Sequence, residues 1–252
     1  MKRYLYNYQA ILTFGQPVIN HSVLLRCIPM NADYQSVEEE HVIFSPDFWV
    51  SRGVDAFGNR ILYGGQRDAH SSYAYVSAGI VSMEPYYVKA ANGVSPIYSL
   101  STPLTLLPAD MSSARTNDVL ADAMAICSRV HGMLEYAPKT TDVDTPVADV
   151  LEIGKGVCQD YAHLMIAICR QSGIPARYVC GLMEGIGETH AWVEVFDGYS
   201  WIGIDPTHNV HIQYGYIKLA HGRDAADCSV SRGLYTSVTS QEQMITVTVK
   251  EI

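Results

Sequence analysis

The feature that most constrains this chain is a change in its hydrophobic periodicity between residues 95 and 110. Before it, short stretches such as 73–76 are rich in β-branched and aromatic residues and are separated by glycine-rich turns. After it, apolar residues recur every three or four positions, first over 119–134. Prolines interrupt the region between at positions 96, 103 and 108. The sequence predicts an α+β protein with an N-terminal antiparallel β-sandwich (1–107) and a second domain (108–252).

Charge and composition narrow the class of partner. The formal net charge is −9, and the Lys and Arg residues do not form a basic block, which argues against nucleic acid. No uninterrupted apolar run reaches the ~18 residues that a membrane span needs, and the first residues do not form a secretory signal. We therefore expect a cytoplasmic protein that binds neither nucleic acid nor membrane.

The six cysteines are scattered and contain no C-x-x-C pair. A disulfide framework or a structural zinc site is therefore not expected, and most of the thiols should be small apolar core residues. The phosphate-binding and dinucleotide-binding glycine motifs are also missing, so we expect no cofactor and no metal.

Cys158 is the exception, because it stands at the predicted start of a helix. Gly154 and Gly156 form a closely approachable loop before it, and apolar residues at helical spacing follow until Gly173 stops the helix. Free N–H groups and the positive end of the helix dipole stabilise a thiolate there and can donate to an oxyanion. Cys169, in the middle of the same helix, has neither advantage and should be inert.

A predicted hairpin supplies two possible partners for this thiol. Asp197-Gly198 lies between alternating apolar runs, which is a strong hairpin signal. With a two-residue loop, His190 lies directly opposite Asp205, where a carboxylate can accept from an imidazole N–H. A loop longer by two residues moves Asp205 to a diagonal position on the same face. Cys158, His190 and Asp205 would then supply a nucleophile, a base and a group that orients the base.

Two other histidines are weaker candidates. His208 and His211 suggest a metal pair by proximity alone, and the sequence places no cysteine or carboxylate at ligand spacing from them. We expect a solvated loop there.

Four segments carry a resemblance to a known family: GVCQDYAH (156–163), GIPARYV (173–179), HAWVE (190–194) and IDPT (204–207). They resemble the core of the bacterial transglutaminase-like cysteine peptidases, and residues 55–59 resemble part of the sandwich that precedes this core in many members. The resemblance implies a papain-like core in 108–252, with helices packed on an antiparallel sheet. It also assigns the catalytic roles to Cys158, His190 and Asp205.

The expected function is thiol-dependent acyl transfer, with hydrolysis of a peptide, isopeptide or related amide through a thioester on Cys158. A true transglutaminase would pass the acyl group to an amine instead. Animal transglutaminases carry a tryptophan upstream of the cysteine, and here tryptophan occurs at positions 49, 192 and 201 instead, which favours water. A non-catalytic interaction module on this fold is a further alternative, which the presence of all three residues disfavours. The sequence leaves the oligomeric state open.

Overall fold

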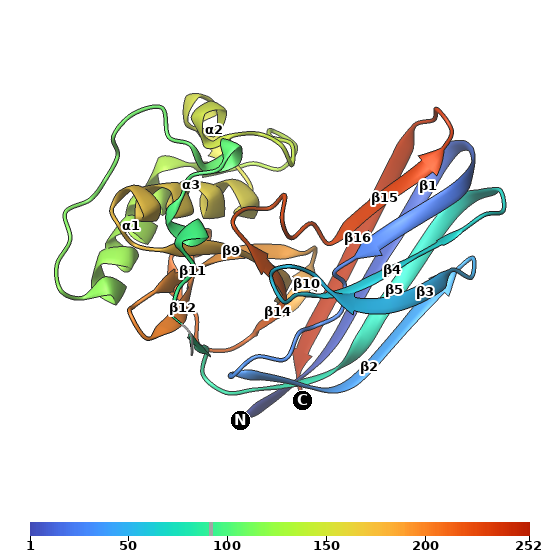
Figure 1. Ribbon diagram of the computed structural model, residues 1–252, viewed down its shortest axis with the longest axis horizontal. Coiled ribbons are helices and arrows are strands. Elements are labelled where there is room, and N and C mark those ends of the chain that lie inside the picture. Colours follow the sequence, from blue (N-terminus) through green and yellow to red (C-terminus); the bar gives the residue numbers. More distant parts are fainter. Residues whose placement is uncertain (91–92) are drawn as a thin grey trace.

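The computed structural model describes residues 1–90 and 93–252. Two antiparallel sheets make up most of the protein, and the helices lie beside the second of them (Figure 1). The predicted α+β class is confirmed. In the part of the chain that the structure describes, helices that are long and apolar enough to span a membrane are absent.

The first sheet is a curled sandwich whose two layers share strand β1 (Lys2–Leu25). The first half of β1 pairs with β5 (His70–Met83) and β16 (Gln241–Glu251). Its second half pairs with β4 (Arg60–Gln66) and β15 (Ser231–Thr236). The outer strands are β2 (Gln35–Ser45), β3 (Trp49–Val54) and β10 (Gly185–Gly187). Alternate residues of β1 and β5 form a core rich in buried tyrosines: Tyr4, Tyr6, Tyr8, Tyr73 and Tyr75.

Several strands of this sheet come from the second part of the sequence. β16 pairs with β1 in unbroken register from Tyr4↔Glu251 to Phe14↔Gln241. Each strand in a sheet has two edges, and β5 satisfies one edge of β1 while β16 satisfies the other. The boundary expected at residue 107 therefore does not coincide with the edge of the sheet.

The second sheet has the strand order β13-β12-β11-β9-β14, with β6 beside β12. Its strands are β6 (Val88–Lys89), β9 (Ala176–Met183), β11 (His190–Phe196), β12 (Ser200–Asp205), β13 (Val210–His211) and β14 (Tyr216–Gly222). The helices are α1 (Val119–Met133), α2 (Val147–Ile153) and α3 (Cys158–Gln171). The proline-rich segment forms the short 3-10 helices η1 (Pro96–Ser99) and η2 (Pro103–Thr105). A short parallel pair, β7 (Glu135–Tyr136) and β8 (Lys155–Gly156), precedes α3.

The second sheet is covered on both faces. Val179 and Trp192 pack into the core of the first sheet, whereas their chain neighbours Tyr178 and Val193 pack against the helices. Successive strand residues point to opposite faces, which explains why β9 and β11 are buried almost throughout. The site residues carried by this sheet are therefore held by packing on both sides.

The helices begin and end where local chemistry requires. The side chain of Asp118 caps α1 by accepting from the Ala121 N–H at 3.0 Å. Gly154 follows α2 with φ +69°, and Gly173 follows α3 with φ +74°, a left-handed conformation that favours glycine. The helices predicted over 119–134 and from Cys158 to the stop at Gly173 are confirmed.

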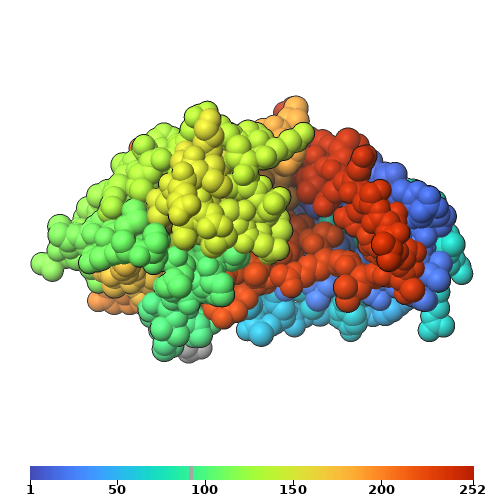
Figure 2. All heavy atoms as spheres, turned by 90° about the horizontal axis from the view of Figure 1, so that it is seen from above, coloured from blue at the N-terminus to red at the C-terminus, as the bar shows by residue number. Residues whose placement is uncertain are grey.

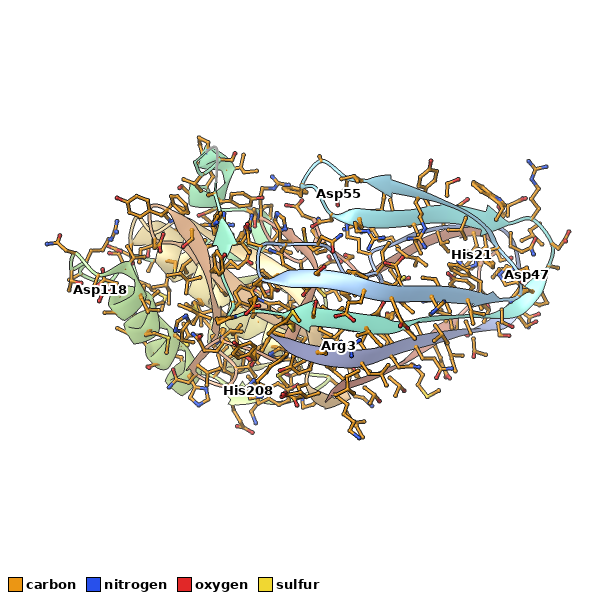
Figure 3. The ribbon with its side chains drawn as sticks, turned by 90° about the horizontal axis from the view of Figure 1, so that it is seen from below. Arg3, His21, Asp47, Asp55, Asp118 and His208 are labelled. Atoms are coloured by element: carbon orange, nitrogen blue, oxygen red, sulfur yellow. The ribbon has the colours of Figure 1, made fainter. Side chains whose placement is uncertain are left out.

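The loop between β3 and β4 ties the first sheet to the second. Asn59 Nδ2 donates to the His221 carbonyl oxygen at 2.8 Å, and the His221 N–H donates to Asn59 Oδ1 at 2.8 Å. Asp55 holds this loop by accepting from Asn59 and from Arg26 Nε, at 3.0 and 2.9 Å. Figure 3 shows Asp55 near the junction of the two halves.

Replacing Asn59 should therefore destabilise the protein. Asn59→Ala removes both hydrogen bonds and leaves the buried backbone groups of His221 unpaired, which should cost about 2–4 kcal/mol. Urea unfolding would measure this loss, with Asn7→Ala on the exposed face of β1 as the matched control. Equal unfolding midpoints for the two variants would contradict the role of this loop.

Candidate active site

Cys158 is the first residue of α3, and the loop before it is fixed by the helix itself. Asp160 Oδ2 accepts from the Val157 N–H and from Thr141 Oγ1, both at 2.7 Å. A Cβ on Gly156 would lie 2.6 Å from Asp160 Oδ2, so this close turn requires glycine. The first N–H groups of a helix have no carbonyl of a preceding turn to bind, and Cys158 stands at this end of α3.

The hairpin differs from the predicted one by two residues in register. Phe196 pairs with Trp201 and Val193 with Ile204, so the loop is not the two-residue Asp197-Gly198 turn. The physical reason is the Asp197 side chain, whose Oδ1 accepts from the N–H groups of residues 199 and 200, both at 2.7 Å, and so closes a longer loop. The shift is even, so His190 and Asp205 remain on one face and lie diagonally.

The structure brings His190 and Asp205 into direct contact, with 2.8 Å between Nε2 and Oδ2. Asp205 is fully buried, and the same Oδ2 also accepts from His208 Nδ1 at 2.7 Å and from Tyr216 OH at 2.8 Å. Its Oδ1 accepts from the Thr207 N–H at 2.8 Å. A buried carboxylate is tolerated when donors surround it in this way.

Sequence reasoning missed His208 and Tyr216. His208 was expected in a solvated loop; its side chain is indeed 47% exposed, but its ring also binds Asp205. Figure 3 shows His208 at the surface of the second half. Tyr216 begins β14, a strand that no local pattern links to Asp205. His190, Asp205 and His208 could also hold a metal ion, since their ligand atoms lie within 4.8 Å of one another. Hydrogen bonds already join these atoms directly.

The contacts of this cluster shift the pKa values of His190 and Asp205 in opposite directions. Burial lowers the pKa of His190, but hydrogen bonds with Asp205 and Cys158 outweigh it and raise the pKa from 6.5 to about 10. Burial raises the pKa of Asp205, but hydrogen bonds from His190 and His208 hold it well below 3.8. The favoured state of His190 is therefore an imidazolium bound to the Asp205 carboxylate.

His190 should therefore stay protonated well above neutral pH. Because its folded pKa exceeds its ordinary value, its contribution to stability is present below pH 6.5 and is lost as the pH rises towards 10. We expect ¹⁵N NMR titration to give a midpoint near pH 10 in the native protein and a lower one in Cys158→Ala, where one of the raising contacts is removed. A midpoint that does not move in Cys158→Ala would contradict the contact between the thiol and the imidazole.

Cys158 also differs from the other cysteines in its exposure. It is partly exposed, whereas the remaining five are buried. Burial raises the pKa of the Cys228 thiol well above 9. It raises the pKa of the other four buried thiols to about 12: Cys27, Cys127, Cys169 and Cys180. Among the cysteines, Cys158 alone is partly exposed and lines a pocket together with His190.

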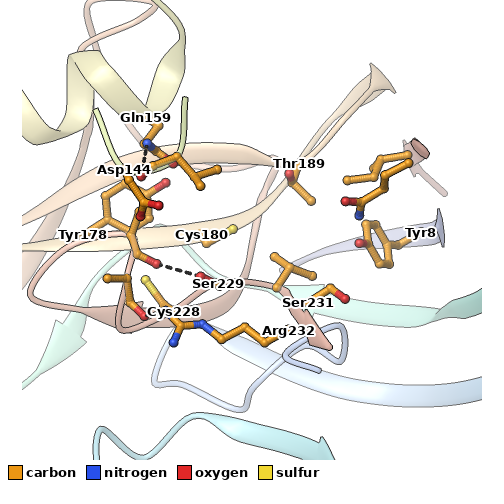
Figure 4. A pocket seen from close by; sticks show the side chains of 16 residues that line it. Tyr8, Asp144, Gln159, Tyr178, Cys180, Thr189, Cys228, Ser229, Ser231 and Arg232 are labelled. Carbon is orange, nitrogen blue, oxygen red and sulfur yellow. Dashed lines mark hydrogen bonds between the residues drawn. The ribbon is translucent and has the colours of Figure 1, made fainter. Parts of the chain in front are cut away.

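Two adjoining pockets lie beside the first turn of α3, and both are lined by Gln159. One, of about 820 Å³, is lined by Cys158, His190 and the segment 183–189. The other, of about 620 Å³, lies between Gln159 and the first sheet, where Arg232 of β15 and Tyr8 of β1 line it (Figure 4). Figure 2 shows the molecular surface hollowed between the helical part and these strands. Residues shared by both pockets make them one cleft, and these include Val143, Gln159, Tyr178, Cys180 and Thr189.

A buried ionic network supports the strand that carries His190. Glu194, on β11, accepts from Lys218 Nζ at 2.7 Å and from Arg177 Nε at 2.5 Å. Tyr86 OH donates to Glu194 at 2.7 Å and accepts from Trp192 Nε1 at 2.8 Å. These contacts join the side chains of β9, β11 and β14 and so hold together the three strands beneath the site.

Comparisons with known proteins identify the family and support the fold. Residues 107–206 match the model of the transglutaminase-like superfamily. An uncharacterized protein of Mycobacterium tuberculosis is 30% identical over 243 residues, which cover 79% of this chain and 76% of that protein. A protein-glutamine gamma-glutamyltransferase of Pseudomonas aeruginosa is 33% identical over 86 residues, which cover 29% of this chain and 13% of that protein.

Among solved structures, the crystal structure of a "Putative Cysteine Protease" from Cytophaga hutchinsonii superimposes with a TM-score of 0.77. The match covers 100% of this chain and 91% of that chain at 20% sequence identity, and at this identity it supports the fold alone. The matched segment 107–206 contains Cys158, His190 and Asp205, the residues that the fold gathers at the cleft. On its sequence, its fold and its relatives, the chain belongs to the transglutaminase-like superfamily.

Proposed function

We propose that this protein is a thiol-dependent acyl-transfer enzyme that hydrolyses a peptide, isopeptide or related amide bond. The observation that carries the proposal is the arrangement around Cys158: a partly exposed thiol at a helix N-terminus, in the same pocket as an imidazole that is itself bound to a buried carboxylate. Activated-thiol catalysis requires this set of groups.

In the proposed reaction, Cys158 transfers its thiol proton to His190. The resulting thiolate attacks the amide carbonyl and forms a C–S bond, while the carbonyl oxygen becomes an oxyanion. The oxyanion accepts hydrogen bonds from first-turn N–H groups of α3, which are already oriented. His190 then gives its proton to the amide nitrogen, the C–N bond breaks, and the free amine leaves a thioester on Cys158. Water, deprotonated by His190, attacks the thioester and releases the acid and the thiol. Asp205 holds His190 in one tautomer throughout.

The first test is the order in which the thiols react. Cys158 should be alkylated fastest by brief iodoacetamide treatment, since the other five thiols are buried. Peptide mapping by mass spectrometry would measure the rates, with Cys169, in the same helix, as the internal control. Faster labelling of Cys169 or Cys180 would contradict the assignment of the nucleophile.

A second candidate function is amine transfer, in which a primary amine replaces water at the thioester. The similarity to the gamma-glutamyltransferase of Pseudomonas aeruginosa over 86 residues favours it. Water is the preferred acceptor in our proposal, in a reaction without added metal. Incorporation of a labelled primary amine faster than hydrolysis, or loss of activity with a chelator, would favour the second candidate.

A cytoplasmic location is also proposed, in line with the six free cysteines, and cell fractionation would test it.

A further inference from the structure

Strand β10 presents one unpaired edge at the cleft. It lies at the end of the strand order β10-β16-β1, so over residues 1–90 and 93–252 it pairs with β16 on one side and with no strand on the other. All its residues line the pocket that contains Cys158 and His190. An edge strand exposes N–H and C=O groups with which another extended chain can pair.

Gly187 leaves this part of the strand without a side chain, although the fold does not require glycine there. Its φ lies outside the positive region, and a Cβ built there meets nothing within 4 Å. Neither backbone conformation nor internal packing therefore requires glycine at this position. Glycine in a strand is typical of a place where another backbone approaches closely. Gly185 is different, since its φ of +121° does favour glycine.

The position of His190 indicates which part of a substrate would lie here. In the proposed function, on which this inference rests, His190 protonates the leaving amine, so the amine side of the substrate passes next to it. Residues 183–189 lead directly into His190 and line the same pocket. The free edge of β10 therefore faces the amine side of the scissile bond.

Two exposed side chains next to this edge point to the chemistry of the bound chain. Ile186 is 84% exposed although it lines the pocket, so an apolar side chain of a ligand could cover it. Glu188 lines the pocket between β10 and His190 and would attract a cation. We propose that the amine side of the substrate is an extended peptide that pairs with β10 as an added antiparallel or parallel strand. This peptide would carry apolar residues and a basic residue near Glu188.

Binding to an inactive variant tests this inference separately from catalysis. In a Cys158→Ala background, we would measure the affinity for two fluorescent peptides, one of alternating valine and lysine and one of alternating valine and glutamate. The lysine peptide should bind more tightly, and adding Gly187→Val should weaken it by about tenfold, since tenfold corresponds to ~1.4 kcal/mol of lost pairing. Peptide binding should also slow amide hydrogen exchange in residues 185–187.

The matched control is Gly132→Ala in α1, where a Cβ likewise meets nothing within 4 Å and φ is not positive. This variant should bind the lysine peptide as the parent does, and thermal unfolding would verify that Gly187→Val is folded. Unchanged affinity in Gly187→Val, equal affinity for the two peptides, or no binding of either would each overturn the inference. The iodoacetamide test does not depend on peptide pairing, so the proposed function would still be judged by it.

Discussion

Cys158→Ala is expected to lower kcat for amide hydrolysis by roughly 10⁴-fold or more, because no other group can form the thioester. The five remaining thiols are buried, so none can substitute for it. Cys158 itself is partly exposed at the end of α3, and its loss should change the free energy of unfolding by less than about 1 kcal/mol. Loss of turnover with retained stability would identify a chemical role.

The control for this variant is Cys169→Ala, at a buried position near the C-terminal end of the same helix. It removes a thiol from the core and should lower stability while leaving kcat near the native value. Turnover of a fluorogenic amide and thermal unfolding would be measured for both, with mass spectrometry of the native enzyme to detect the acylated Cys158 peptide. If Cys158→Ala kept more than a small part of the activity, the thioester mechanism would have to be abandoned.

Asp205→Asn should lower kcat by about 10⁴-fold. An amide in place of the carboxylate donates to His190 Nε2 instead of accepting from it, which favours the wrong tautomer and removes the charge that stabilises the imidazolium. A stability cost of ~1–3 kcal/mol should accompany this loss, because His208 and Tyr216 also lose an ionised acceptor.

The pH dependence of stability separates this prediction from general damage to the fold. The pKa of Asp205 is held below 3.8, so its ionised form stabilises the native state above that pH and the effect is lost as the pH falls further. The difference in unfolding free energy between the native protein and Asp205→Asn should therefore shrink in acid. Urea unfolding at pH 7 and pH 3 would measure it, and a difference that grew in acid would be inconsistent with the charged contact.

The positions of Cys158, His190 and Asp205 in the fold could be predicted from the sequence because local chemistry determines them. Glycines before Cys158 and a helical repeat after it place the thiol at a helix start, and Asp197-Gly198 marks a hairpin that joins the strands of His190 and Asp205. The exact register of β11 and β12 could not be predicted, because the Asp197 side chain closes a longer loop. Its even shift preserved the face, which is what the site depends on.

Long-range contacts were beyond the sequence for a different reason. Tyr216 reaches Asp205 through the pairing of β14 with β9, and β16 reaches β1 across most of the chain. Periodicity reports whether a segment is a strand, but not which distant strand it will pair with. This is why the sandwich was expected within residues 1–107 although its sheet takes strands from later residues.

The pairing of β1 with β16 has a consequence for how the protein is made. Lys2 and Glu251, whose side chains bond at 2.8 Å, are 249 positions apart in the sequence. At 5–20 residues per second, a ribosome needs about 10–50 s between them. During that time β1 has one edge without its strand, and aromatic-rich edges of this kind promote aggregation. Completion of the sheet is therefore expected only once β16 has been made, after the more local contacts of α3 with its strands have formed.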